Sequence, residues 1–214
     1  EEANIEPEIY HLNEGHALPV AFHLYSKFGS LAEVKKRMVF TTHTPEAAGN
    51  EEHDCNLLHR MGFFNGMSQE EARAITGHEG GKFSLTLGAL RVSKIANGVS
   101  KLHGEVANKM WESYPNICPI ISITNAQNKK FWADKPLQNA YDEYDDYGLL
   151  ARKKHLKRKL FDIVADQTGK MFDPEVLTIV WSRRFAEYKR AGLIKRNWEK
   201  FHELVTRKDK PIQV

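Results

Sequence analysis

Short runs of apolar and β-branched residues alternate along the chain with longer segments of helical periodicity. The apolar runs predict buried strands over residues 8–12, 37–42, 118–124 and 176–181. Continuous apolar runs of this length are typical of parallel strands that are covered on both faces. Because strands and helices alternate, the sequence predicts an α/β fold with a Rossmann-like parallel sheet, right-handed connections and flanking helices.

The helical segments have clear boundaries. Apolar periodicity predicts helices over residues 17–28, 83–95, 101–111 and 144–166. The last helix keeps one apolar stripe, while lysines and arginines cover the rest of its surface and form a solvated face. Gly169 is expected to end this helix, and Asn97-Gly98 predicts a turn before the helix at 101–111.

The composition is typical of a soluble globular chain. Of the 214 residues, 41% are hydrophobic and 28% are charged, and the net charge of +3 is too small to favour a nucleic-acid or membrane surface. No apolar run is long enough to span a bilayer. Cys55 and Cys118 lie far apart, which disfavours a disulfide framework or a cysteine-rich zinc site and favours a reducing, cytoplasmic setting.

The two ends of the sequence predict that it is a piece of a longer protein. The chain has no initiator methionine and begins close to an apolar run. Residues 210–214 look like the first half of a buried strand, and a half-strand would leave its neighbour unpaired.

Candidate chemistry gathers where the predicted strands end. Ligands of open α/β sheets bind just beyond the carboxyl ends of the strands. Polar clusters follow the strands here at residues 11–16, 41–50, 124–125 and 181–190. We therefore take these clusters as the candidate site.

Each cluster before residue 126 allows a structural interpretation beside the functional one. His11, Glu14 and His16 do not have the spacing of a helical metal-binding motif, so no metal site is predicted, and they could simply cap the next helix. His43 could hydrogen-bond a substrate hydroxyl, although a lone histidine is more often structural. Asn125 could bind a sugar hydroxyl or serve as a turn residue.

The cluster at residues 181–190 is basic. Arg183, Arg184, Lys189 and Arg190 follow the predicted strand at the expected start of a helix. A helix start is itself positive, so an anion would complete this arrangement, and guanidinium and ammonium groups together favour phosphate. The alternative is salt bridging to Glu187 and other surface acids.

Taken together, these segments resemble the α-glucan (glycogen, maltodextrin) phosphorylase family, in its shorter bacterial and archaeal branch. The segments that carry the resemblance are 11–17, 39–45, 89–93, 96–106, 123–125 followed by Trp132, and 177–191. They occur in the order of the family over nearly the whole chain.

The resemblance implies a two-domain GT-B type glycosyltransferase fold. Residues 1–140 would be the later part of the N-terminal Rossmann-like half, 141–175 a connecting long helix, and 176–214 the start of the C-terminal half. It also implies phosphorolysis, in which inorganic phosphate cleaves the terminal glucose of an α-1,4-glucan and gives α-glucose 1-phosphate with retention. The implied cofactor is pyridoxal phosphate, whose phosphate group takes part in proton transfer.

The roles of individual residues follow from the same resemblance. His43 would bind the donor glucose and help to stabilise the transition state, and Asn125 would bind a glucose hydroxyl. Arg184 and Lys189 would hold the substrate phosphate against the cofactor phosphate. The remaining predicted substrate-binding residues are Asn13, Glu14, His16 and Arg183. The lysine that forms the Schiff base would lie beyond Val214, so this chain alone is expected to be inactive and not to bind the cofactor.

One departure and two alternatives accompany this interpretation. Ala126-Gln127 replaces the glycine that commonly follows the strand-end asparagine, which affects the loop and its sugar contacts. The alternatives are a nucleotide-sugar-dependent glucan synthase of the same architecture and a catalytically inactive glucan-binding module. The implied partners are α-1,4-glucan, inorganic phosphate and the missing C-terminal half-domain, and a homo-oligomer is also compatible.

Overall fold

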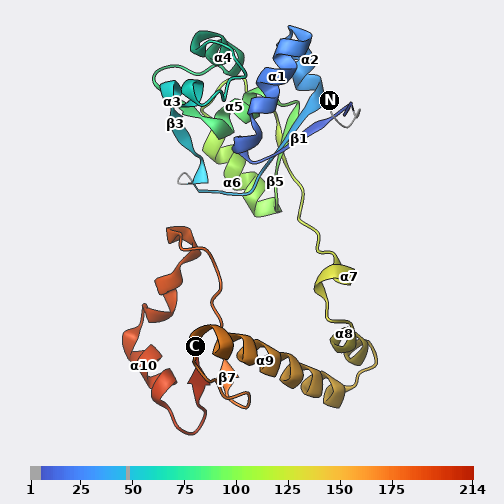
Figure 1. Ribbon diagram of the computed structural model, residues 1–214, viewed down its shortest axis with the longest axis vertical. Helices are drawn as coiled ribbons and strands as arrows, with labels where there is room; N and C mark the ends of the chain where they lie inside the picture. Colours follow the sequence, from blue (N-terminus) through green and yellow to red (C-terminus); the bar gives the residue numbers. More distant parts are fainter. Residues whose placement is uncertain (1–5, 47–48) are drawn as a thin grey trace. The chain divides into compact units, whose positions relative to one another are not determined.

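The computed structural model describes residues 6–46 and 49–214. The chain forms two compact units, residues 1–126 and residues 127–214 (Figure 1). We call them unit 1 and unit 2 and describe each by itself.

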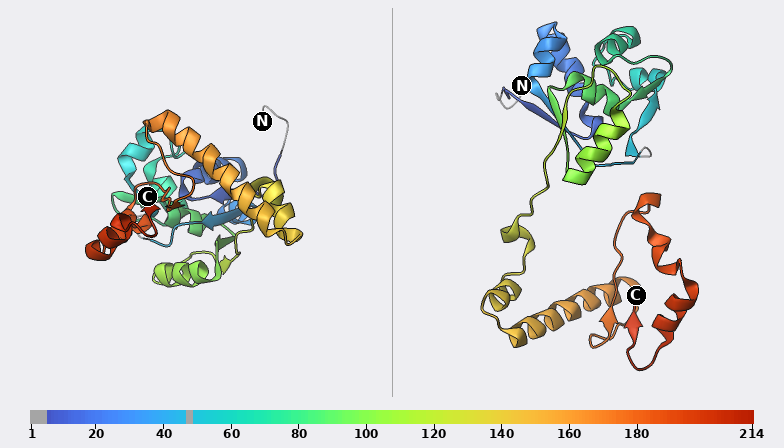
Figure 2. Two further views of the ribbon diagram at one scale, coloured as in Figure 1. Left: turned by 90° about the horizontal axis from the view of Figure 1, so that it is seen from below. Right: turned by 180° about the vertical axis from the view of Figure 1, so that it is seen from behind.

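Unit 1 contains a four-stranded parallel sheet with the strand order β1-β2-β5-β6 (Figures 1 and 2). Its strands are β1 (Tyr10–Asn13), β2 (Met38–Thr42), β5 (Ile95–Gly98) and β6 (Ile120–Ser122). The register pairs Asn13 with Thr41 and Thr41 with Asn97, so the carboxyl ends of three strands lie at one edge. The predicted α/β class is confirmed.

Helices and a small second sheet surround these strands. The helices of unit 1 are the 3₁₀ helix η1 (Gly15–Ala17), α1 (Pro19–Phe28), α2 (Leu31–Arg37), α3 (Cys55–Arg60), α4 (Gln69–Thr76), α5 (Leu85–Val92) and α6 (Lys101–Trp111). Strands β3 (Glu52–Asp54) and β4 (Lys82–Ser84) form an antiparallel pair. Helix α5 packs on β2, and α6 packs on β5 and β6.

The strand β5 was not predicted from the sequence, which suggested the end of a helix and a turn at this position. The reason is that Ala96-Asn97-Gly98 lacks the long apolar residues of a buried strand. Glycine is needed here because a Cβ atom on Gly98 would lie 2.9 Å from the backbone nitrogen of Gly104 in α6. The close approach of α6 to β5 therefore explains the glycine at position 98, a residue type that otherwise indicates a turn.

The core of unit 1 is built from aliphatic side chains and a cluster of phenylalanines. The rings of Phe22 and Phe64 lie 5.3 Å apart, and those of Phe64 and Phe83 lie 5.2 Å apart. All three side chains are fully buried. This cluster joins α1, the segment after α3, and β4 into one hydrophobic core.

His78 locks the end of α4 to β4. Its ring stacks on Phe83 with a centroid distance of 4.0 Å, and its Nε2 accepts the Ser84 N–H at 3.2 Å. Its Nδ1 lies 2.8 Å from the Thr76 hydroxyl oxygen. Burial and the nearby Arg91 guanidinium lower the pKa of His78 to about 4, so the ring is neutral in the folded protein above that pH.

Unit 2 is dominated by the 23-residue helix α9 (Figure 2). Its elements are α7 (Lys129–Trp132), α8 (Lys135–Asp142), α9 (Asp146–Thr168), β7 (Leu177–Thr178), the 3₁₀ helices η3 (Glu187–Lys189) and η4 (Ala191–Lys195), α10 (Trp198–Thr206) and β8 (Ile212–Gln213). Gly169 ends α9 in the left-handed conformation, as predicted. Strand β7 is shorter than the predicted run at 176–181, and it pairs in parallel with β8.

A half-buried ion pair holds α8 and α9 together. Arg152 of α9 donates to both carboxylate oxygens of Asp134 at 2.9 and 2.7 Å. Asp134 also caps α8 by accepting the Leu137 N–H, and the Arg152 hydrogen bonds are the main reason that the pKa of Asp134 is lowered to about 2.

Over the described residues, no helix has the length and apolar content to cross a membrane.

A substitution at Gly98 tests the close approach of α6 to the sheet. We expect Gly98→Ala to lower the free energy of unfolding by about 1–3 kcal/mol, because the new methyl group meets backbone that cannot give way. Gly81→Ala is the matched control, since a Cβ there meets nothing within 4 Å. Urea unfolding of the chain measures both, and equal effects of the two substitutions would contradict the packing argument.

The low pKa of His78 predicts a pH dependence of stability. Above pH 6.5 the ring is neutral in both the folded and the unfolded protein, so the stability that depends on the neutral ring is fully present. As the pH falls toward 4, the unfolded chain takes up a proton that the folded chain does not, so stability is lost over this window. We expect a loss on the order of 1–2 kcal/mol, reduced from the full effect by partial exposure of the ring.

The control for this prediction is His78→Gln, which keeps a polar side chain that does not titrate. Unfolding in urea at several pH values compares the two proteins. A wild-type curve that runs parallel to the His78→Gln curve between pH 6.5 and 4 would show that His78 is not the group responsible.

Candidate functional site

A chain of hydrogen bonds crosses the carboxyl edge of the sheet. The Thr41 hydroxyl donates to Asn97 Oδ1 at 2.7 Å, and His11 Nε2 lies 2.6 Å from the same hydroxyl oxygen. Because the hydroxyl proton is already used, Thr41 accepts from His11, whose Nε2 carries the proton. Strands β1, β2 and β5 are thus tied together by side chains at the edge where ligands of such sheets bind.

Glu14 directly follows β1 and has an unusual backbone conformation. Its φ of 66° and ψ of 169° fall in a region that is populated almost only by glycine and costs about 1–3 kcal/mol for other residues. Two hydrogen bonds hold it there. Its N–H donates to the Thr41 carbonyl at 3.0 Å, and its Oε1 accepts the His43 N–H at 2.6 Å.

The next residue, Gly15, lets the chain pass close to α5. A Cβ atom on Gly15 would lie 2.7 Å from the Cβ of Leu85. The strained Glu14 and the crowded Gly15 together direct the chain from β1 into η1. His16 lies in η1 and is exposed, and Asn13 at the end of β1 is exposed as well.

The structure brings some of the predicted residues together. Glu14 and His43 are in direct contact through the hydrogen bond to the His43 backbone, and the His43 side chain is exposed. Asn125 continues the ladder beyond β6, because its N–H donates to the Val99 carbonyl at 3.1 Å. The Asn125 side chain is exposed, and within the described part of the chain it makes no hydrogen bond.

His103 was not singled out as a site residue from the sequence. It lies in the first turn of α6 and is only 5% exposed, and its Nδ1 accepts the Val99 N–H at 3.1 Å. Desolvation lowers the pKa of this imidazole, while the Glu14 charge acts in the opposite direction and His43 adds to the lowering. The signal for it in the sequence was a histidine three residues after Ser100, the residue that caps α6.

The basic residues of unit 2 lie in a largely irregular segment. Arg183 and Arg184 are exposed, and the Lys189 ammonium lies 4.7 Å from the centre of the Tyr188 ring. Over residues 6–46 and 49–214, none of these cations forms an ion pair with a carboxylate. Salt bridging to Glu187, the structural alternative, is therefore not observed.

The expected start of an α-helix within this segment is wrong. Only η3 occurs there, and the first α-helix after it, α10, begins at Trp198. Arg190 has a left-handed φ of 54° that separates η3 from η4, which a continuous α-helix cannot accommodate. Any anion bound by this segment would therefore be held by side chains rather than by a helix terminus.

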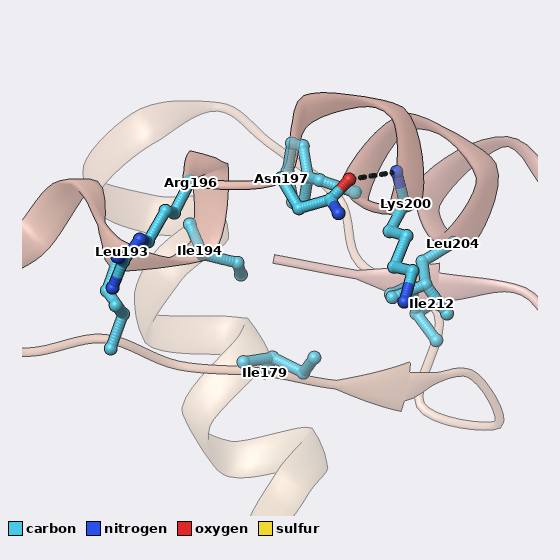
Figure 3. A pocket seen from close by; sticks show the side chains of 9 residues that line it. Ile179, Leu193, Ile194, Arg196, Asn197, Lys200, Leu204 and Ile212 are labelled. Carbon is cyan, nitrogen blue, oxygen red and sulfur yellow. Dashed lines mark hydrogen bonds between the residues drawn. The ribbon is translucent and has the colours of Figure 1, made fainter.

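Unit 2 also contains a cavity of about 460 Å³, shown in Figure 3. Its lining is mostly apolar, with Arg196, Asn197 and Lys200 among the side chains that surround it (Figure 3). Asn197 caps α10 by accepting the Lys200 N–H at 3.0 Å. Among the described residues that line this cavity, Arg183, Arg184 and Lys189 are absent, so the cavity and the basic segment are separate features.

Comparison with known proteins extends the resemblance seen in the sequence. No family model matches the chain. It is 28% identical to the maltodextrin phosphorylase of Thermococcus litoralis over 98% of its own length, and 25% identical to the glycogen phosphorylase of Aquifex aeolicus over 100%. The chain is a distant homologue of the glycogen and maltodextrin phosphorylases.

A further relative, an uncharacterised protein of Methanocaldococcus jannaschii, is 44% identical over 97% of the chain. The chain spans only 31–39% of the length of these relatives. The phosphorylase homology implies that its α/β structure is part of a GT-B fold. The roles of the predicted site residues remain predictions.

Two substitutions at Glu14 test the strained backbone. Both Glu14→Ala and Glu14→Gly remove the carboxylate, but only glycine relieves the conformation at φ 66°. We therefore expect the glycine variant to be more stable than the alanine variant by about 1–2 kcal/mol in urea unfolding. Glu79 lies in a loop and has an ordinary φ, so there the alanine variant should be at least as stable as the glycine variant. A glycine variant that is the more stable one at both positions would contradict the strain at Glu14.

Proposed function

We propose that this chain is part of an α-glucan phosphorylase. The intact enzyme would transfer the terminal glucose of an α-1,4-glucan to inorganic phosphate and release α-glucose 1-phosphate with retained configuration. The observation that carries this proposal is the homology to phosphorylases, which extends over 97–100% of the chain and so includes both the sheet edge and the basic segment.

In this proposal, the sheet edge of unit 1 binds the sugar. Cleavage of a glycosidic bond develops positive charge at the anomeric carbon, so a neutral imidazole that hydrogen-bonds the sugar is preferable to a cationic one. The exposed side chains of His43 and Asn125 offer hydrogen-bond donors and acceptors to sugar hydroxyls. Glu14 and the exposed Asn13 and His16 would contribute further polar groups to the same edge.

The basic segment of unit 2 would bind phosphate. Arg184 and Lys189 have no carboxylate partner within the ranges that the structure describes, so their charge is available to an anion. Arginine forks and a lysine ammonium suit phosphate oxygens, and Arg183 adds a third cation. Fixed positive charge of this kind is the main electrostatic means of stabilising a reacting phosphate.

Pyridoxal phosphate, the cofactor that the resemblance implies, would supply a phosphate group for proton transfer beside the substrate phosphate. Two phosphates repel each other unless cations lie between them. The exposed guanidinium of Arg184 and the half-buried Lys189 fit that requirement chemically. The Schiff-base lysine and the rest of the cofactor site would lie outside this chain.

The organisation of the whole enzyme is part of the proposal. Residues 1–140 would belong to the first Rossmann-like half, 141–175 would connect the halves, and 176–214 would begin the second half. Cytoplasmic location and a homo-oligomeric assembly are compatible with this interpretation. The isolated chain would be inactive, since it would lack most of one half.

The activity test uses the full-length protein that contains this chain. We expect glucose 1-phosphate to be released from maltodextrin only when inorganic phosphate is present. Arg184→Ala should lower turnover by about two to three orders of magnitude, as is typical for the loss of one key electrostatic donor, and should leave glucan binding intact. Arg207→Ala is the matched control, because Arg207 is an exposed arginine of the same unit that pairs with Asp209.

Three outcomes would contradict the proposal. Absence of phosphate-dependent release would exclude phosphorolysis. Glucan extension from ADP-glucose without pyridoxal phosphate would favour the synthase alternative. Glucan binding with neither reaction would favour the inactive binding module.

A further inference from the structure

His103 carries a buried hydrogen-bond donor that the described part of the protein leaves without a partner. Its Nδ1 accepts the Val99 N–H, so Nδ1 is unprotonated and the proton of the neutral ring lies on Nε2. Nε2 is buried, and within the described residues nothing accepts from it. A buried donor without a partner is costly, and its retention in a folded protein calls for an explanation.

The location of this donor follows from the register of the sheet. Thr42 of β2 pairs with Gly98 of β5. The next residue of each strand, His43 and Val99, therefore lies at neighbouring strand ends, about 5 Å apart in a parallel sheet. A side chain caps the backbone N–H of each: Glu14 caps His43, and His103 caps Val99.

The Glu14 carboxylate and the His103 ring therefore cap adjacent strand ends at the candidate site. Only one Glu14 oxygen, Oε1, has a hydrogen-bond partner among the residues whose placement is described, which leaves Oε2 able to accept another. The Glu14 charge raises the pKa of His103, against the larger effect of burial, which agrees with this placement. The carboxylate lacks a donor on one oxygen, and the imidazole lacks an acceptor on Nε2.

We propose that His103 is a positioning residue, whose Nε2–H holds the Glu14 carboxylate through one bridging water at the sheet edge. Held by the His43 backbone on one side and by His103 on the other, the carboxylate is fixed as an acceptor for a polar ligand group. This also gives a reason for the strained conformation of Glu14, since its side chain reaches the end of β2 from that conformation. This inference rests on the proposed function, because its first test measures kcat/KM for phosphorolysis.

Two substitutions at His103 separate the proposed role from simple capping. In His103→Asn, the amide oxygen can replace Nδ1 as the acceptor for Val99, but no donor reaches the position of Nε2. In His103→Gln, the longer amide can place a donor near that position. We expect the asparagine variant to fold normally and to lose on the order of 10- to 100-fold in kcat/KM for phosphorolysis, as for a lost hydrogen bond to a charged group. The glutamine variant should recover most of that loss.

A double-substitution cycle with Glu14→Ala tests the pairing itself. If His103 acts through Glu14, His103→Asn should have little further effect on kcat/KM once the carboxylate is removed. Wild-type activity in a stably folded His103→Asn variant would overturn the inference, and so would independent, multiplying effects of the two substitutions.

Failure of the proposed function would be seen separately, in a wild-type protein that releases no glucose 1-phosphate. The pairing can then be measured from unfolding alone. Non-additive effects of Glu14→Ala and His103→Asn on the urea midpoint would support it, and additive effects would overturn it.

Discussion

The parallel register of β1, β2 and β5 is the constraint on which the candidate site depends. It aligns the carboxyl ends of three strands, and it leaves backbone N–H groups at His43 and Val99 that need acceptors beyond the ladder. Side chains from neighbouring elements supply these acceptors. Glu14 and His103 do this, and polar groups thereby gather at one edge of an otherwise apolar sheet.

Close backbone packing makes this arrangement possible. A Cβ on Gly98 would meet the backbone of Gly104, and a Cβ on Gly104 would lie 2.8 Å from the Cβ of Ser122. Helix α6 can therefore lie directly on β5 and β6, with its first turn at the strand ends. The ring of His103 reaches the edge because its helix approaches so closely, so two glycines with no polar side chain of their own help to decide where that polar side chain lies.

The sequence predicted the fold class and several elements because their residues carry a local signal. The helix Lys101–Trp111 has its predicted bounds, and β2 lies within its predicted run. Strand β5 was missed because the glycine that tertiary packing demands is also the residue of a turn. The strand-end clusters predicted Glu14 and His43 as site residues, and those roles stay predictions. The strain at Glu14 and the unpartnered donor on His103 could not be predicted, because both depend on contacts between distant segments.

The two units offer different chemistries, which the proposed function would use for different parts of phosphorolysis. In the proposed function, the edge of unit 1 would bind sugar hydroxyls through amides, imidazoles and the Glu14 carboxylate, and it would place no lysine or arginine beside a developing cationic carbon. The basic segment of unit 2 presents cations that repel one another and that, in the described chain, have no acidic partners. Such a cluster is tolerated in solvent because water screens it, and a bound dianion would offset the repulsion between the cations by attracting each of them. In the proposed function, sugar recognition at the edge of unit 1 and phosphate recognition by unpaired cations of unit 2 would therefore be complementary, and each would fall to a different part of the chain.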